Sequence, residues 1–169
     1  MPIQPIFRCA IFFICFFPFC GQQKDISTEN DDLYARALSA SIEEMEKSWG
    51  SIDDSCCSSR IRTNYRHLIV EKDEITESLP KQFGTHEIEY LDSQELKDRY
   101  QRLRKEFAVL RVHPLRYNGG HLKIFIGVSW FKAKKGHLVY AFSDWSEVEF
   151  QYNCEKQNWE IANVKLGGI

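Results

Sequence analysis

The strongest constraint on the fold is a C-terminal run of alternating apolar and polar residues, interrupted by Asn118, Gly119 and Gly120. These residue types between two alternating segments are typical of a β-hairpin turn, because asparagine and glycine readily adopt positive φ angles. Later turns divide the rest of the run in the same way, which predicts a four-stranded antiparallel meander. The four strands are expected over residues 108–117, 121–132, 137–152 and 159–166.

Two amphipathic helices are predicted before this meander. The first covers residues 31–49, where apolar side chains recur at three- and four-residue spacing. Short strands are expected next, over residues 60–70 and 86–91. The second helix begins after Asp92, whose carboxylate can cap the first turn. Its apolar seam is expected to contain Leu96, Tyr100, Leu103 and Phe107.

The predicted fold class is α+β, with two helices packed on a curved antiparallel sheet that ends in the meander. Because a sheet must bury its apolar face, both helices are expected to cover that one face. The element order over residues 31–166 resembles the cystatin-like cone of the nuclear-transport-factor-like superfamily, in which a bent sheet wraps a helix and leaves an open cavity. That superfamily includes enzymes, ligand binders and interaction domains, so the resemblance implies a fold and leaves function open.

An apolar run covers residues 7–20, with Arg8 near its start and a polar segment after it. This order is typical of a secretory signal peptide. The run is shorter than the ~20 apolar residues that a membrane-spanning helix needs. The chain is therefore expected to be exported, either to a periplasm or out of the cell. The predicted organisation is a signal peptide at 1–21, a flexible linker at 22–30 and a single α+β domain at 31–169.

Lipidation of Cys20 is the alternative fate of this leader, and it would anchor the protein to a membrane. The preceding residues, Phe17, Pro18 and Phe19, differ from the small residues that precede the cysteine in bacterial lipoprotein signals. Membrane contact is expected only through the leader or through a lipidated Cys20.

The charge balance argues against nucleic acid as a partner. The chain has 22 Lys and Arg residues against 24 Asp and Glu residues, a net charge of −2. Nucleic-acid binding needs a basic field, which this composition does not supply. The histidines and cysteines show no metal-site spacing, and no glycine loop is placed to hold phosphate, so neither a metal nor a cofactor is predicted.

The hairpin predicts one mixed face that could bind a ligand. A three-residue turn would place Tyr117 opposite His121 and would sort the apolar side chains to one face. The other face would then carry cations and aromatic rings, which suits an anionic ligand or an acidic partner protein. A solvated outer sheet face is the alternative interpretation. The predicted binding residues are Arg111, His113, Tyr117, Lys123 and Ser129.

Acid–base chemistry has one candidate group. Asp144 follows Ser143 at a predicted β-bulge, and bulges can redirect side chains toward a site. Pairing of Asp144 with His113 or Tyr140 would supply a carboxylate next to a second proton carrier. A polar bend between two strand halves explains the same residues.

Six cysteines divide into two groups. Cys9, Cys15 and Cys20 lie in the leader, and three remain in the mature chain. In an oxidising compartment, the predicted disulfide joins Cys154 to Cys56 or Cys57, because a bond between the adjacent pair would be strained. The alternative is three unpaired, buried thiols.

These observations favour an exported, non-enzymatic binding or interaction domain that uses its curved sheet face. Its expected partner is another protein or a small anionic ligand. Two alternatives remain open: a small cone-fold enzyme that uses Asp144 and His113, and a membrane-anchored envelope protein.

Overall fold

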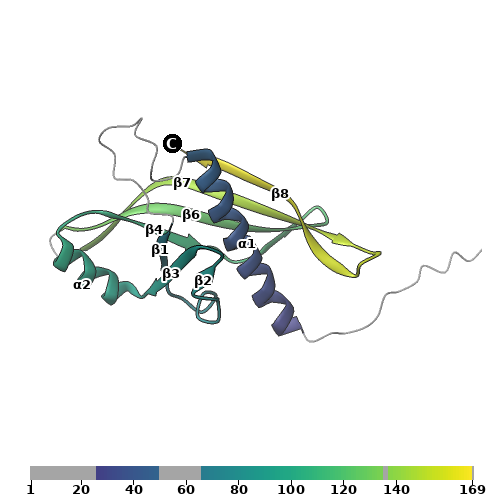
Figure 1. The fold of residues 1–169 in the computed structure, drawn as a ribbon, viewed down its shortest axis with the longest axis horizontal. Coiled ribbons are helices and arrows are strands. Elements are labelled where there is room, and N and C mark those ends of the chain that lie inside the picture. The colour runs from purple at the N-terminus through teal and green to yellow at the C-terminus, as the bar shows by residue number, and fades with distance from the viewer. Residues whose placement is uncertain (1–25, 50–65, 135–136, 169) are drawn as a thin grey trace, which may run out of the picture.

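The computed structural model describes residues 26–49, 66–134 and 137–168, and these residues form two helices and eight strands (Figure 1). The elements in chain order are α1 (Ile26–Trp49), β1 (His67–Glu71), β2 (Gln82–Phe83), β3 (His86–Leu91), α2 (Ser93–Leu103), β4 (Phe107–Val112), β5 (Arg116–Asn118), β6 (His121–Lys134), β7 (His137–Asn153) and β8 (Asn158–Gly168).

All eight strands belong to one curved, unclosed sheet in the order β2-β3-β1-β4-β6-β7-β8, with β5 paired to β6 beyond the end of β4. The predicted α+β class and the meander of β4, β6, β7 and β8 are confirmed. The sheet is mixed, because β1 runs parallel to both β3 and β4. Parallel neighbours need crossover connections, and here the segment containing β2 and the helix α2 provide them.

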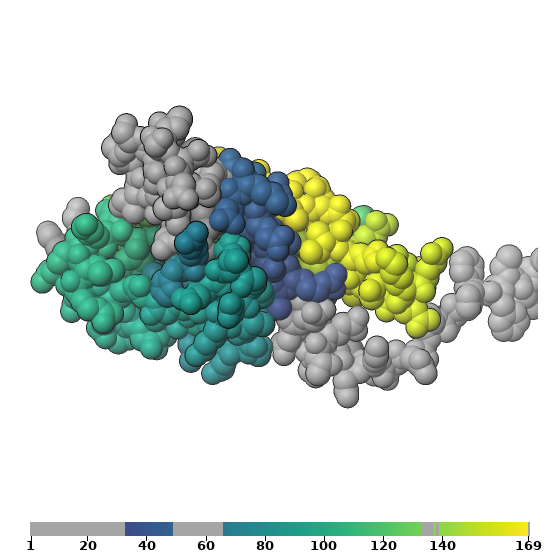
Figure 2. All heavy atoms as spheres, viewed as in Figure 1, coloured from purple at the N-terminus to yellow at the C-terminus, as the bar shows by residue number. Residues whose placement is uncertain are grey.

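Helix α1 crosses one face of the sheet and covers the larger core (Figure 1). In the space-filling view, α1 lies between the β1–β3 region and the yellow C-terminal strands (Figure 2). Its buried side chains recur at the predicted helical spacing. They pack against β4, β6 and β7 in a core that includes Leu38, Ile42, Leu110, Ile124, Ile126, Val148 and Phe150.

Helix α2 covers part of the opposite face, over a smaller core formed by Ile69, Leu91, Leu96, Val109 and Phe131. Along β1, Leu68 and Val70 belong to the α1 core whereas Ile69 belongs to the α2 core. Consecutive residues of a strand point to opposite faces. The expectation that both helices cover one face is therefore wrong, because the inner strands are apolar on both sides and each side needs cover.

The start of α2 confirms the predicted cap. Asp92 accepts hydrogen bonds from the backbone N–H groups of Gln94 and Glu95, at 2.8 and 2.9 Å. Glu95 in turn accepts from the Asp92 N–H at 2.8 Å, which completes a capping box. The predicted seam is shorter than expected, because Leu103 is 47% exposed and Phe107 already lies in β4.

Helix α1 begins at Ile26, earlier than predicted, so residues 26–30 of the expected linker are helical. The predicted signal peptide at 1–21 lies outside the described residues, as do Cys20, Cys56 and Cys57.

The register of the hairpin agrees with the prediction in the β4–β6 pairing but not at the tip. Strand β4 pairs with β6 as a three-residue turn would require, with Ala108 opposite Trp130. At the tip the turn has two residues, so Asn118 pairs with His121 and Tyr117 pairs with Leu122. The one-residue shift falls between β4 and β5, in a segment that contains a proline unable to donate a ladder hydrogen bond.

The bulge predicted near Ser143 is confirmed. Val128 pairs with Asp144 and Ser129 pairs with Phe142, which leaves Ser143 as the extra residue. Its hydroxyl donates a hydrogen bond to the Val128 carbonyl at 3.3 Å.

Candidate functional site

The structure places the predicted binding residues on two faces. Arg111, His113, Lys123 and Ser129 lie on the α2 side of the sheet, as expected from their spacing. Ser129 is only 4% exposed and cannot reach a ligand. Tyr117 is 70% exposed, but its pairing with Leu122 puts it on the α1 side. Ser129 and Tyr117 therefore do not belong to a common binding surface with Arg111, His113 and Lys123.

Beyond α2, this side of the sheet carries a row of rings that we call the aromatic face: His113, Phe125, Phe142 and Trp145. The Phe125 ring lies 5.6 Å from Trp145 and 6.4 Å from Phe142, with interplanar angles of 25° and 16°. His113 meets the edge of Phe125 at 5.3 Å. Phe142 is 43% exposed and the other three rings are partly exposed. Among the described residues, no helix covers this part of the sheet.

Two glycines let these rings lie close to the backbone. A Cβ at Gly167 of β8 would overlap the Trp145 ring, and a Cβ at Gly127 would lie 3.2 Å from Phe142 Cε2. The Trp145 ring therefore rests on the β8 backbone and Phe142 leans over β6. The small interplanar angles show that the three rings are nearly parallel and stacked.

Two of the basic residues next to the aromatic face, Lys123 and His121, have acidic partners. Lys123 Nζ lies 3.0 Å from Glu147 and 3.4 Å from Glu149, and His121 Nδ1 lies 3.0 Å from Glu149. The hydrogen bond to Glu147 raises the pKa of Lys123. An anionic ligand at Lys123 would have to compete with these carboxylates.

Arg111 belongs to a polar cluster between the aromatic face and α2. Its guanidinium forms an ion pair with Glu71 and lies 5.0 Å from the centre of the Tyr140 ring. The Tyr140 hydroxyl donates to Glu71 at 3.1 Å. Burial, followed by the nearby Glu71 charge, raises the pKa of Tyr140 to about 12. Burial, followed by Arg111 and Arg116, lowers the pKa of His113, which favours its neutral form.

Asp144 does not join His113 or Tyr140. It shares a face with Ser146, whose hydroxyl reaches α1, and so Asp144 points to the α1 side. His113 and Tyr140 lie on the α2 side. The sheet separates the carboxylate from both of its predicted partners, so these residues do not form the acid–base site that the sequence suggested.

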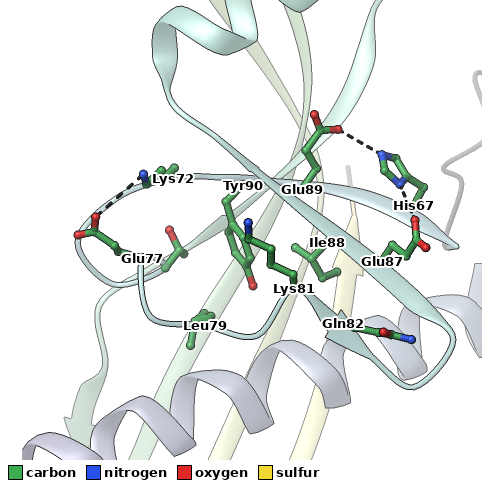
Figure 3. A pocket seen from close by; sticks show the side chains of 11 residues that line it. His67, Lys72, Glu77, Leu79, Lys81, Gln82, Glu87, Ile88, Glu89 and Tyr90 are labelled. Atoms are coloured by element: carbon green, nitrogen blue, oxygen red, sulfur yellow. Dashed lines mark hydrogen bonds and ion pairs between the residues drawn. The ribbon is translucent and has the colours of Figure 1, made fainter.

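A hollow of about 660 Å³ lies beside β1 and β3, away from the predicted site residues (Figure 3). His67 bridges Glu87 and Glu89 there, at 3.4 and 3.2 Å, and Lys72 faces Glu77. Only three of its lining residues, Leu79, Ile88 and Tyr90, are hydrophobic. Ligand pockets usually have a mostly apolar lining, so we interpret this hollow as the surface of an ion-pair network.

Three further features bear on function. Within the described segments, no group of three or more His, Cys, Asp or Glu residues is placed to hold a metal ion. Neither described helix is both long enough and apolar enough to cross a membrane. Cys154 is an exposed, free thiol at the β7–β8 turn.

Comparison with known proteins completes this description. No protein-family model, no curated protein and no solved structure matches the chain. The resemblance of the element order to the cystatin-like cone therefore remains a prediction.

Sequence reasoning missed two rings of the aromatic face, Phe142 and Trp145. Residues three apart in a regular strand point to opposite faces. The bulge at Ser143 adds one residue and brings both rings to the same side. The predicted bulge was the signal that could have found them, if the alternation had been restarted after it.

Proposed function

We propose that this protein is an exported, non-enzymatic binding domain whose ligand contacts the aromatic face. The observation that carries the proposal is a group of partly exposed rings on a sheet surface without a described cover. Clustered exposed aromatic rings on a soluble domain mark binding surfaces more often than isolated ones do. The ammonium group of Lys123 is already paired with Glu147 and Glu149, so at this position the rings offer more binding surface than the charge does.

The enzyme alternative has no comparable support. It needs Asp144 and a second proton carrier in one place, and the two lie on opposite sides of the sheet. The cone-type fold would be compatible with either function.

Chemical-shift mapping tests the binding surface directly. We would record ¹H–¹⁵N spectra of the protein against a library of small soluble fragments. We expect shifts to gather on β6, β7 and β8 around Phe125, Phe142 and Trp145. Phe142→Ala should abolish them, whereas Tyr117→Ala removes a more exposed ring on the α1 side and should not. Shifts confined to the hollow beside β3, or to Asp144, would contradict the proposal.

The intact mass of the protein from its native host tests export and the oxidation state of the cysteines. A soluble form that begins near Gln22 would support a signal peptide, and a lipid-modified Cys20 would support an anchored envelope protein. A loss of two hydrogens would support the proposed bridge from Cys154 to Cys56 or Cys57. A chain that keeps Met1 in the cytoplasm would contradict export.

A further inference from the structure

The sheet order ends with β2 on one side and with β8 on the other, and β8 is the longer of the two (Figure 1). Strand β2 has two residues, whereas β8 has 11 and contains no proline. In the part of the chain that the structure describes, no strand and no other backbone hydrogen bond reaches the outer side of β8. Unpaired N–H and C=O groups along such an edge can pair with a strand of another chain.

A bulge at the middle of β8 decides which of its side chains share a side. Glu149 pairs with Asn163 and Phe150 pairs with Ile161, so Ala162 is an extra residue. Bulges often protect an edge strand from pairing, because they interrupt its regular alternation. In a two-fold pairing, however, the bulge of one strand lies opposite the bulge of the other.

The side chains of β8 are arranged symmetrically about this bulge. Its only charged residues, Glu160 and Lys165, both lie on the α2 side, where they pair with Gln151 and Glu147 of β7. They are five positions apart, so without the extra residue they would lie on opposite sides. The α1 side carries apolar residues at matching distances from the bulge: Trp159, Ile161, Val164 and Leu166.

We propose that two copies of this chain pair through their β8 strands, antiparallel and about a two-fold axis at the bulge. A symmetric dimer needs a surface that is complementary to itself. In this register Glu160 faces Lys165 of the partner subunit on the α2 side, and Ile161 faces Val164 of the partner subunit on the α1 side. The register also uses nearly the whole strand, from Asn158 to Gly167. Such pairing goes beyond the proposed function and needs no ligand.

Lys165 is available for an ion pair with the partner subunit. Its side chain is exposed, and among the described residues it forms no ion pair. Its neighbour across the ladder, Glu147, is bound by Lys123 at 3.0 Å. An unpaired lysine on an edge strand normally discourages pairing, whereas a lysine with a carboxylate opposite it favours a single register.

Glu160 has partners within its own chain and keeps room for another. Its carboxylate accepts from Asn153 at 2.9 Å and from Lys156 at 2.7 Å. These bonds, with a smaller contribution from Arg36, lower the pKa of Glu160, so it is ionised near neutral pH. A carboxylate has about four lone-pair sites. Two bonds therefore leave Glu160 able to accept from Lys165 of the partner subunit.

The pairing would extend the sheet and bring the two aromatic faces to one side of it. A two-fold axis perpendicular to the sheet keeps the α2 sides of both copies together. A single strand edge supplies few side chains, so it covers less than the roughly 800 Å² per partner of a standard interface. We therefore expect a reversible dimer that dissociates on dilution.

Sedimentation velocity over a range of protein concentrations tests the proposal. A reducing agent is present, because the exposed Cys154 could otherwise link two chains. We expect a monomer–dimer equilibrium. Glu160→Lys and Lys165→Glu should each raise its dissociation constant about tenfold, because two attractive pairs become two repulsive pairs. Lys105→Glu makes the same charge change at an exposed position beyond α2 and should leave the equilibrium unchanged.

A mixture of the two β8 variants is the decisive measurement. In a mixed dimer the lysine introduced at position 160 faces the glutamate introduced at position 165, and the native Lys165 and Glu160 face each other. Both pairs are attractive, so the mixture should dimerise nearly as well as the unaltered protein. Far-ultraviolet circular dichroism confirms that each variant is folded, and the double variant, whose exchanged charges also attract, serves if one of them is not.

Three results would overturn the proposal. The protein could stay monomeric at every concentration, or the single variants could dimerise as well as the unaltered protein, which would place the interface elsewhere. A mixture that dimerises no better than its two components would show that Glu160 and Lys165 do not face each other across the axis.

Discussion

The buried hydroxyl of Ser146 shows how one residue can fix a helix on a sheet. Ser146 lies on β7 among the side chains of the α1 core, and its hydroxyl donates to Ser41 Oγ of α1 at 2.8 Å. Both residues are fully buried. A polar group in such a place is costly unless its partner is present, so the pair selects one position of α1 along the strand.

Removal of one hydroxyl should therefore cost more than removal of both. We expect Ser146→Ala to lower the free energy of unfolding by ~1–3 kcal/mol, because Ser41 is left buried without a partner. The double variant with Ser41→Ala should recover part of this loss. Urea denaturation of the single and double variants measures the coupling. Ser39→Ala on the exposed side of α1 is the control, and strictly additive losses for the buried pair would contradict the argument.

Because of Tyr140, the free energy of unfolding should fall at alkaline pH. Its pKa rises to about 12 in the folded protein, chiefly through burial, whereas an unfolded tyrosine titrates near pH ~10. The stabilising contribution is therefore complete below pH ~10 and is lost as the pH rises toward 12. Thermal denaturation between pH 9 and 12 should show this loss, and Tyr140→Phe should reduce it. An unchanged pH dependence in the variant would assign the effect to other groups, such as Tyr90, whose pKa burial also raises to about 12.

Features of the helices and strands that depend on a single residue could be predicted from the sequence. The Asp92 cap and the bulge at Ser143 were both predicted from residue type and position. The register at the hairpin tip was not predicted. The residues Asn118, Gly119 and Gly120 are compatible with a two-residue turn and with a three-residue turn. The pairing between β4 and β6 follows the three-residue register, and the shift between β4 and β5 lets the tip form a two-residue turn.

The capping box of α2 should be measurable. Asp92→Ala removes the acceptor for two backbone N–H groups and should cost about 1 kcal/mol of unfolding free energy. Glu95→Gln keeps an acceptor for the Asp92 N–H and should cost much less. Chemical denaturation compares the two variants. An equal loss in both would show that charge near the helix N-terminus matters more than the hydrogen bonds do.

The close contact of Trp145 with β8 yields a second prediction at this scale. In Gly167→Ala the new methyl group would overlap the indole ring, so the ring must leave the backbone. We expect a change in near-ultraviolet circular dichroism and the loss of any binding at the aromatic face. Gly168→Ala is the matched control: its methyl group would lie 2.6 Å from the Asp144 carboxylate, which can rotate away. Identical spectra for the two variants would contradict this placement of Trp145.

The residues that the structure describes form two cores that share strands. The α1 core and the α2 core lie on opposite sides of β1, β4 and β6. Alternation along the strands predicted the apolar and mixed sides of β6. It could not predict that Phe131 and Val109 are buried beneath α2, because the position of a helix over a mixed face depends on the crossovers between parallel strands. The aromatic face is the part of that side which α2 leaves open.

Shared strands should make the two cores unfold together. Ile124→Val in the α1 core and Ile69→Val in the α2 core should each cost ~0.5–1.5 kcal/mol. We expect both variants to shift the same urea transition, with far- and near-ultraviolet circular dichroism giving coincident curves. Separate transitions, with Ile69→Val affecting only one of them, would show that the α2 side opens independently.

The extra residue in β7 divides that strand into two phases. Up to Phe142, even-numbered positions point to the α2 side, and from Asp144 onward odd-numbered positions do. Deletion of Ser143 would restore one uninterrupted alternation of side chains along β7. One half of β7 would then have to turn over, taking either Tyr140 and Phe142 or Ser146, Val148 and Phe150 to the wrong side. Substitutions on this surface can therefore accumulate one at a time during evolution. Deletion of this single codon would instead move the buried side chains of half a strand to the opposite face of the sheet.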